Sequence, residues 1–368
     1  MNPFKFGQVV SGSDFCGREG LIDQLLEKIE VGQNCLIQGE RRVGKTSLLM
    51  EVASRSRKKG LFIDLMEIKT IDEMCERMLR ALASLRGKHF MSWVFDTLGH
   101  LRPAVTMNTE TGQPSLSFQS VDFRVQSIHG ILELIEKTNK HTPLVVIFDE
   151  FQDVLNLEDS RRIQAELRSK IQYQADMTYF FAGSIRNRMD DIFNHHDSPF
   201  YKSALTFTVE PLPFEVFVPF LIKRFDRGKR RVDEVVFRKI FEIAQNIPGD
   251  IQQLCEAMWS LSGEGEALTE EKMHEAVRII LSRERKVYEM VIAGLTVNQA
   301  KVLRTIAAIG GRQPTSKKFL AEAGDITSAG VLRALKRLED TKILYRTAEG
   351  YKFSNTFFRA WMLNREAV

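Results

Sequence analysis

A glycine-rich loop between an apolar run and a helix-forming stretch constrains this chain more than any other feature. The loop follows residues 34–38, which read as a strand, and precedes residues 46–56, which have helical composition. It matches GxxxxGK followed by Thr, a pattern whose backbone N–H groups surround phosphates at a helix N-terminus. The sequence therefore predicts a parallel α/β sheet with an ATP and Mg²⁺ site that includes Gly39, Glu40, Arg41, Arg42, Val43, Gly44, Lys45, Thr46 and Ser47.

The roles of these residues follow from the chemistry of the motif. Lys45 is expected to reach the β- and γ-phosphates and so to take part in catalysis, and the Thr46 hydroxyl is expected to bind Mg²⁺. The most apolar run of the chain, Leu144–Phe148, ends in Asp149 and Glu150. Ionised carboxylates at the end of a buried strand are unfavourable unless they are paired or metal-bound. We assign Asp149 to Mg²⁺ and Glu150 to the orientation and activation of the attacking water.

The order of apolar runs and helical periods predicts three parts. Residues 1–212 alternate strand and helix, which favours a parallel five-stranded sheet with helices on both faces, interrupted by a hairpin at about 102–120. Residues 213–295 are helical in period and predict an all-α lid. Residues 296–368 begin with the capping-box pattern Thr296-Val-Asn-Gln299 and continue as three helices and a hairpin, which predicts a winged helix.

Composition excludes several other classes of protein. The chain has 368 residues, 43% of them hydrophobic and 27% charged, which is typical of a globular protein of two or three domains. No apolar run is long enough to span a bilayer, and the N-terminus lacks a secretion signal, so we expect a cytoplasmic protein. The four cysteines form no CxxC pair, which argues against a zinc site or a disulfide framework.

Positive charge is concentrated at the C-terminal end. The formal net charge is only +4, yet residues 296–368 carry thirteen Lys and Arg against six Asp and Glu. Arg333, Lys336 and Arg337 recur at helical spacing on the third helix of the expected winged helix, where they could contact DNA phosphates. A solvated basic face without a partner, or a protein-docking role, explains the same pattern. A second basic cluster at 223–231 either extends a nucleic-acid track or is an exposed loop whose charges keep the helices soluble.

Other segments carry a resemblance to a known family. These segments are Phe15-Cys16-Gly17-Arg18-Glu19, Asp149-Glu150-Phe151-Gln152, Phe181-Ala182-Gly183-Ser184, Ser198-Pro199-Phe200-Tyr201 and Tyr351–Trp361. With these segments, and with Glu directly after the expected metal-binding Asp, the chain resembles archaeal-type P-loop ATPases of the AAA+ and STAND group, which are distantly similar to archaeal origin-recognition ATPases.

This resemblance implies roles for residues outside the two motifs. Phe15, Gly17 and Arg18 would lie near the adenine, and Ser184 would be a polar sensor near the γ-phosphate. Pro248 would lie in the lid segment that closes over the base.

The chain departs from the family at one position, because Gln252 stands where the origin-recognition relatives have an arginine. The charge on the γ-phosphate would then be met by Arg186, by Arg188 or by a neighbouring subunit.

The sequence thus predicts an Mg-dependent ATPase that acts as a nucleotide-dependent switch or remodeller coupled to a winged helix. The expected partners are nucleotide, duplex DNA through the winged helix, and a second copy or a protein client, with no membrane. The alternatives are a DNA-loading protein with a regulatory ATPase, a protein-docking signalling switch of the STAND type, and a small-molecule kinase. The kinase is disfavoured because nothing after Glu150 supplies an obvious pocket for a second substrate.

Overall fold

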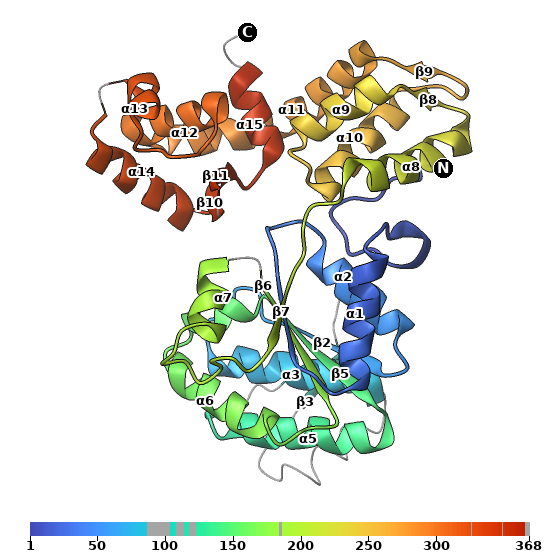
Figure 1. Cartoon of the computed structure of the whole chain (residues 1–368), viewed down its shortest axis with the longest axis vertical. Coiled ribbons are helices and arrows are strands. Elements are labelled where there is room, and N and C mark those ends of the chain that lie inside the picture. The colour runs from blue at the N-terminus through green and yellow to red at the C-terminus, as the bar shows by residue number, and fades with distance from the viewer. Residues whose placement is uncertain are drawn as a thin grey trace. The chain divides into compact units, whose positions relative to one another are not determined.

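The computed structural model describes residues 1–86, 104–107, 114–117, 123–183, 186–324, 326–347 and 349–364 (Figure 1). The chain forms two compact units. The sheet unit comprises residues 9–40 and 45–209, and the lid and winged-helix unit comprises residues 1–8, 41–44 and 210–368. The second unit is therefore assembled from three separate stretches of sequence.

A five-stranded sheet forms the centre of the sheet unit. Its order is β2-β5-β6-β1-β7, and every neighbouring pair is parallel, as the sequence predicted. In a parallel sheet the carboxyl ends of the strands meet at one edge, so the residues after β1 and after β5 come to the same edge although β6 lies between these strands. The strands are β1 (Cys35–Gln38), β2 (Lys59–Asp64), β5 (Leu144–Asp149), β6 (Thr178–Gly183) and β7 (Leu205–Thr208).

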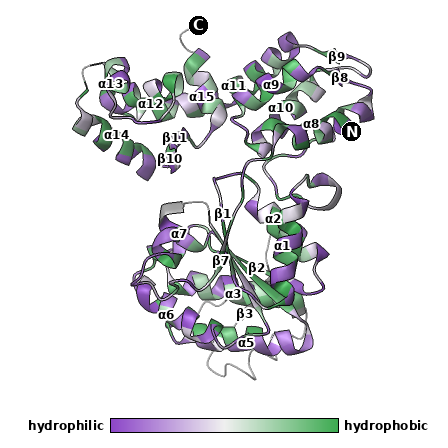
Figure 2. Ribbon diagram, viewed as in Figure 1, coloured by the Kyte–Doolittle hydropathy of each residue, from purple (hydrophilic) through white to green (hydrophobic). Residues whose placement is uncertain are grey.

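Helices cover both faces of this sheet because successive strand residues point to opposite sides. Phe148 and Phe181 pack with buried residues of α3, α5 and α6 in one core cluster, and the opposite face is left for α1 and α2. The central strands carry the hydrophobic colour in Figure 2, whereas the surrounding helices show both colours. The helices are α1 (Glu19–Glu30), α2 (Lys45–Arg55), α3 (Ile71–Arg86), α5 (Ser127–His141), α6 (Ser160–Ile171) and α7 (Arg186–Phe193), with 3-10 turns η1 (Gly12–Asp14) and η3 (Phe151–Asn156).

Two short strands lie within the segment where the sequence predicted a hairpin insert. Strands β3 (Ala104–Met107) and β4 (Pro114–Ser117) pair antiparallel, with Ala104 opposite Ser117. The rest of the 102–120 segment lies outside the described residues.

The lid contains four helices and the N-terminal segment of the chain. Phe4 is buried against Phe225 and Trp259, at ring-centroid distances of 4.6 and 6.1 Å, and the Pro3 carbonyl accepts a hydrogen bond from Arg224. The helices are α8 (Phe214–Phe225), α9 (Glu234–Ile243), α10 (Pro248–Ser260) and α11 (Glu270–Ala293), and η4 (Asp226–Gly228) follows α8.

One feature of the lid differs from the all-α expectation. The two-residue strands β8 (Arg231–Val232) and β9 (Ala267–Leu268) pair in parallel. Strands this short carry no period-2 pattern, so they could not be predicted from the spacing of apolar residues.

The C-terminal part has the expected helices and hairpin, with an additional helix. Thr296 and Gln299 form the predicted capping box, in which the Gln299 N–H donates to the Thr296 hydroxyl at 3.4 Å and the Thr296 N–H donates to the Gln299 side-chain oxygen at 2.9 Å. The extra helix, α15, packs against α11, where the rings of Phe358 and Tyr288 stack at 5.0 Å. The elements are α12 (Val297–Ile309), α13 (Lys317–Ala323), α14 (Ser328–Asp340), β10 (Leu344–Thr347), β11 (Gly350–Phe353) and α15 (Thr356–Asn364).

None of the helices in the described parts of the chain combines the length and apolar character needed to cross a bilayer.

Candidate nucleotide-binding site

The structure brings the two predicted halves of the metal site together. Thr46 lies in the first turn of α2, and Asp149 is the last residue of β5. The Thr46 hydroxyl donates a hydrogen bond to the Asp149 carboxylate at 2.5 Å, across a sequence separation of 103 residues. The contact forms because both residues lie at the carboxyl edge of the same parallel sheet.

Asp149 is held in an environment that disfavours its charge. Burial raises the pKa of this carboxyl above its ordinary value, the Thr46 hydrogen bond opposes that rise, and the neighbouring Glu150 charge adds to it. A hydroxyl and a buried carboxylate are the hard oxygen donors that Mg²⁺ prefers, and a divalent cation would compensate the buried charge. The donor set therefore fits Mg²⁺, with Thr46 and Asp149 as the residues that would hold it.

Lys45 is directed back toward its own loop. Its side chain is almost fully buried, and Nζ donates to the carbonyl oxygens of Gly39 at 3.2 Å and Glu40 at 2.9 Å. Gly44, just before it, has φ +96°, a conformation that glycine adopts at little cost. A triphosphate would offer Nζ charged oxygens in place of these neutral carbonyls, and hydrogen bonds to charged acceptors are stronger.

Glu150 is displayed by a constrained turn. Its backbone lies in the left-handed region at φ +50°, and the next residue, Phe151, is fully buried with its ring 4.8 Å from that of Phe181. Gln152 is also buried and donates a hydrogen bond from Nε2 to the Glu150 carboxylate at 2.6 Å. Gln152 thus orients the predicted catalytic carboxylate, a role that the sequence did not assign. Its only signal was a position two residues after Glu150, within reach across a tight turn.

The segment before α1 lies beside the P-loop helix. The Val10 N–H donates to the Ser47 hydroxyl at 3.1 Å, and the Gly12 N–H donates to the Glu51 carboxylate at 2.7 Å. Arg55 of α2 forms ion pairs with both Glu51 and Glu19, the last residue of the Phe15–Glu19 segment. These contacts fix the segment with Phe15, Gly17 and Arg18 against α2, and Arg18 has a left-handed backbone at the start of α1. The adenine contact expected of these three residues stays a prediction.

The expected γ-phosphate residues are only partly described. Ser184 lies outside the described residues, as does the side chain of Arg186, although the backbone of Arg186 begins α7. Arg188 pairs with Asp153 at 3.4 Å and donates to the Asn156 side chain at 2.7 Å, so it secures the 3-10 turn after β5.

A buried carboxylate in the lid contacts both a P-loop residue and the winged helix. Asp250, in the first turn of α10, is fully buried and accepts hydrogen bonds from Arg42, one of them at 3.1 Å, and from the Thr356 hydroxyl at 2.7 Å. Burial raises the pKa of Asp250, and Arg42 and Thr356 oppose that rise. The three groups lie in the same structural unit, and Thr356 is the first residue of α15. Nothing in the local sequence around Asp250 pointed to this arrangement.

Two other lid residues have identifiable surroundings. Pro248 occupies the first turn of α10, where its missing N–H costs nothing. Gln252, which stands in place of the family's arginine, is buried, and its side-chain oxygen accepts the Lys5 N–H at 3.4 Å. The proximity of Pro248 to nucleotide stays a prediction.

The two basic clusters differ in structure. Arg333, Lys336 and Arg337 are exposed on the face of α14 opposite its buried residues, and none of them forms an ion pair with a described residue. In the lid cluster, by contrast, Arg224 and Arg230 are buried, and the Arg230 guanidinium lies 3.8 Å from the ring centroid of Trp259. Neither interpretation of the lid cluster therefore applies to these two arginines, which pack in the lid interior.

The sheet order, the P-loop and the C-terminal elements together define a P-loop NTPase fold that ends in a winged-helix domain. A family model described as a probable winged helix domain matches residues 286–364. A Walker-type ATPase of Pyrococcus abyssi has a similar structure, with a TM-score of 0.67, 18% identity, and coverage of 95% of this chain and 96% of that one. The expected resemblance to archaeal ATPases is therefore confirmed for the fold.

More distant structural matches are found as well. The Orc1 protein of Aeropyrum pernix, solved in complex with DNA, gives a TM-score of 0.49 with 13% identity and coverage of 97% and 94%. The Cdc6p protein of Pyrobaculum aerophilum gives a TM-score of 0.45 with 12% identity and coverage of 99% and 97%. No curated protein sequence matches the chain.

Proposed function

We propose that this chain is an Mg-dependent ATPase that acts as a nucleotide-dependent switch or remodeller, with a winged helix that binds duplex DNA. The observation that carries the ATPase part is the 2.5 Å hydrogen bond between Thr46 and Asp149. Glu150 follows Asp149 directly in the sequence. The contact between Thr46 and Asp149 supports the proposal because it joins a hydroxyl and a carboxylate at one edge of the sheet, next to Glu150, which we propose as the general base.

The residues divide the work of hydrolysis. The loop N–H groups and the Lys45 ammonium bind the phosphates, and Thr46 and Asp149 hold Mg²⁺, which supplies charge neutralisation on the phosphate oxygens. Glu150 orients the attacking water and accepts its proton, and the hydrogen bond from Gln152 fixes the direction of that carboxylate. Ser184 and Arg186 are proposed to contact the γ-phosphate.

Paired variants test the ATPase assignment. Lys45→Ala should abolish binding of a fluorescent ATP analogue, because the ammonium that compensates the phosphate charge is lost. Glu150→Gln should retain binding and lower ATP turnover by about a hundredfold or more, the usual contribution of a general base. Lys59→Ala and Glu158→Gln remove exposed charges of the same kind elsewhere in the sheet unit and should leave both measurements unchanged.

Two results would contradict the assignment. Wild-type protein that retains no nucleotide at millimolar Mg-ATP would remove the proposed function altogether. Unchanged turnover in Glu150→Gln would remove Glu150 as the base while leaving the binding site intact.

DNA binding is supported by the exposed basic face of α14. Arg333, Lys336 and Arg337 are spaced to lie on one side of the helix, and no described carboxylate neutralises them. Cations that contact phosphates displace condensed counterions, so affinity falls as salt rises. These three side chains form no pattern that would read DNA bases, and we therefore expect weak sequence selectivity.

A salt titration tests this part. Binding of a random duplex, measured by fluorescence anisotropy, should weaken with salt, and changing all three residues to Ala should reduce the slope of log K against log salt by about 3. Arg283→Ala with Lys286→Ala, on exposed positions of α11, is the matched control. No binding at the lowest salt would instead favour a protein-docking winged helix.

The switch is supported by the contacts of Asp250. This carboxylate links Arg42, a residue of the P-loop, to Thr356 of the winged helix, so a change in the loop that moves Arg42 alters the surroundings of α15. Small-angle scattering with an ATP analogue, with ADP and without nucleotide should give different dimensions. Identical dimensions in the three states would rule the switch out and leave the ATPase assignment untouched.

A further inference from the structure

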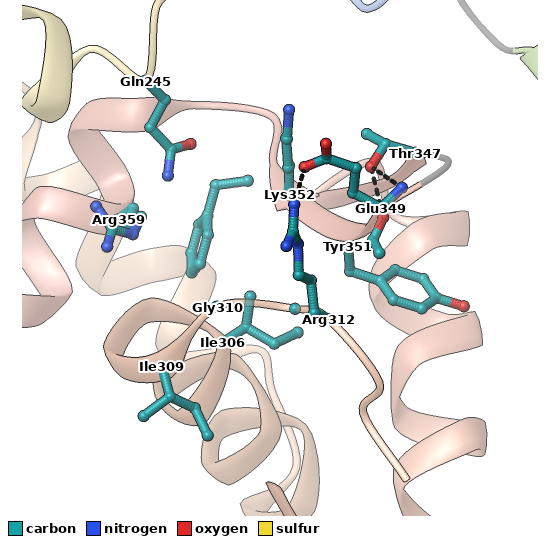
Figure 3. Close-up of a pocket in the computed structure, with 13 residues that line it drawn as sticks. Gln245, Ile306, Ile309, Gly310, Arg312, Thr347, Glu349, Tyr351, Lys352 and Arg359 are labelled. Carbon is teal, nitrogen blue, oxygen red and sulfur yellow. Dashed lines mark hydrogen bonds and ion pairs between the residues drawn. The ribbon is translucent and has the colours of Figure 1, made fainter. Parts of the chain in front are cut away.

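A cavity of about 310 Å³ lies within the lid and winged-helix unit, beside the hairpin of the winged helix (Figure 3). We call it the hairpin cavity. Its wall includes Gln245 from the turn after α9, Ile306 and Ile309 from the end of α12, and Arg359 from α15. The volume is at the lower end of the range for small-molecule sites, which corresponds to a ligand of small-metabolite size.

One wall of the hairpin cavity is made by a close approach of two backbones. Gly311 pairs with Tyr351 across a β-bridge, and a Cβ at Gly311 would lie 2.1 Å from the Tyr351 carbonyl oxygen. Gly350, at φ +141°, has the Gly311 carbonyl oxygen 2.3 Å from where its Cβ would be. Only glycine at both positions permits this approach. The loop after α12 is therefore held against the hairpin, and Arg312 in this loop becomes part of the cavity lining.

The hairpin cavity carries an excess of positive charge. Three basic residues line it, Arg312, Lys352 and Arg359, against one carboxylate, Glu349. Glu349 is already paired with Arg312 at 2.8 Å, and that hydrogen bond lowers the pKa of the Glu349 carboxyl. Figure 3 shows Arg312, Lys352 and Glu349 on one side of the cavity and Arg359 with Gln245 on the other. The Arg359 side therefore has a cation and no carboxylate in the lining.

Arg359 is the lining residue whose charge most needs an anionic partner. It is half-buried, and its guanidinium forms no hydrogen bond or ion pair with any residue in the described part of the chain. Burial lowers the pKa of Arg359, and only the attraction of the exposed Glu242 carboxylate opposes this. A guanidinium that is partly removed from water without a partner is unfavourable, and its planar set of donors matches a carboxylate or a phosphate.

The rest of the lining is apolar. Ile306 and Phe353 are almost completely buried, and Ile309 is 40% exposed at the edge. Figure 3 shows Ile306 and Ile309 along the side of the cavity below the basic residues. A ligand that satisfies both surfaces has an acidic group and an apolar body.

We propose that the hairpin cavity is a second ligand site, distinct from the P-loop, which binds a small organic anion: a phosphate or carboxylate recognised by Arg359, attached to an apolar or aromatic body that packs on Ile306, Ile309 and Phe353. Gln245 supplies an amide for a neutral polar group of the ligand. The inference does not depend on ATP hydrolysis or on DNA binding.

Ligand-detected NMR and calorimetry on the full-length chain test the proposal with four probes: phenyl phosphate, benzoate, benzyl alcohol and inorganic phosphate. Phenyl phosphate or benzoate should bind with one-to-one stoichiometry, and whichever binds more tightly identifies the acidic group. Benzyl alcohol lacks the charge and inorganic phosphate lacks the apolar body, so both should bind at least about tenfold more weakly.

Variants locate the binding. Arg359→Gln should weaken the better probe by about tenfold or more. Ile309→Trp leaves Arg359 unchanged and fills part of the cavity from an exposed position, so it should also weaken probe binding. The test therefore holds even if Arg359→Gln fails to fold. Arg304→Gln, an exposed arginine of α12 outside the cavity, should have no effect. Lys45→Ala should leave probe binding intact, which separates this site from the P-loop.

Four outcomes would overturn the proposal. They are no binding of either aromatic anion at millimolar concentration, equal binding of benzyl alcohol, loss of binding in Lys45→Ala, and full binding in Ile309→Trp. If Arg359→Gln weakened duplex DNA binding while the aromatic anions failed to bind, the cavity would belong to a nucleic-acid surface instead.

Discussion

Replacing Thr356 by Val should destabilise α15 selectively. The Thr356 hydroxyl donates a hydrogen bond to the Asp250 carboxylate, and water cannot take the place of that donor because the carboxylate is buried. Thr356 and Asp250 are both fully buried, and their oxygens are 2.7 Å apart. A hydrogen bond to a charged group contributes about 1.5–3 kcal/mol, so we expect a loss of about 2 kcal/mol. Because every 1.4 kcal/mol is a tenfold change, opening of α15 should become roughly thirtyfold more frequent.

The other partner of Asp250 should matter less. Arg42→Gln leaves the Thr356–Asp250 hydrogen bond in place and removes no contact of α15 itself, so it should change the opening of α15 less than Thr356→Val does.

Amide hydrogen exchange on peptides from residues 356–364 measures this opening directly. Thr341→Val removes an exposed hydroxyl at the end of α14 and serves as the matched control, with exchange expected to stay at the wild-type rate. Two results would refute this reasoning. One is an exchange rate in Thr356→Val within twofold of the wild-type rate, and the other is a larger effect on exchange from Arg42→Gln than from Thr356→Val.

Three further predictions concern the sheet unit and the winged helix. Burial makes the folded Asp149 carboxyl bind a proton more tightly than the unfolded one, so nucleotide-free protein should lose stability as pH rises from the unfolded-state value through the raised folded-state pKa. Asp149→Asn should reduce this loss in urea unfolding series, and an unchanged pH slope would argue against it. Gln152→Ala should lower kcat with little change in KM, whereas a change in KM alone would show that Gln152 only shapes the binding site. Gly311→Ala should lower the melting temperature because its Cβ would meet the Tyr351 backbone, while Gly20→Ala, with open space around it, should not.

The parts of the molecule that depend on short stretches of sequence were predictable. The P-loop, the strand that ends in Asp149, and the capping box at Thr296 each fall within a few consecutive residues, so pattern and propensity identify them. The meeting of Thr46 and Asp149 was also predictable, because a parallel sheet brings the ends of its strands to one edge.

The contacts that could not be predicted join distant residues of ordinary type. Asp250 meets Arg42 across 208 positions and Thr356 across 106, and no local pattern distinguishes it from a surface acid at a helix N-terminus. Arg224 and Arg230 appear in a basic run that looks solvated, yet both are buried, because Arg224 donates to the distant Pro3 carbonyl and Arg230 packs on Trp259 of α10. Burial of this kind is decided by tertiary packing, which overrides local composition.

The position of Phe4 has a consequence for how the chain is made. Its ring packs on Phe225 and Trp259, which a ribosome adds more than two hundred residues later. Until then the first residues have no surface to pack on, whereas the strands between them can pair as they emerge. Synthesis therefore favours completion of the sheet before the N-terminal residues join the lid, and a stall near residue 210 would leave Phe4 exposed on the nascent chain.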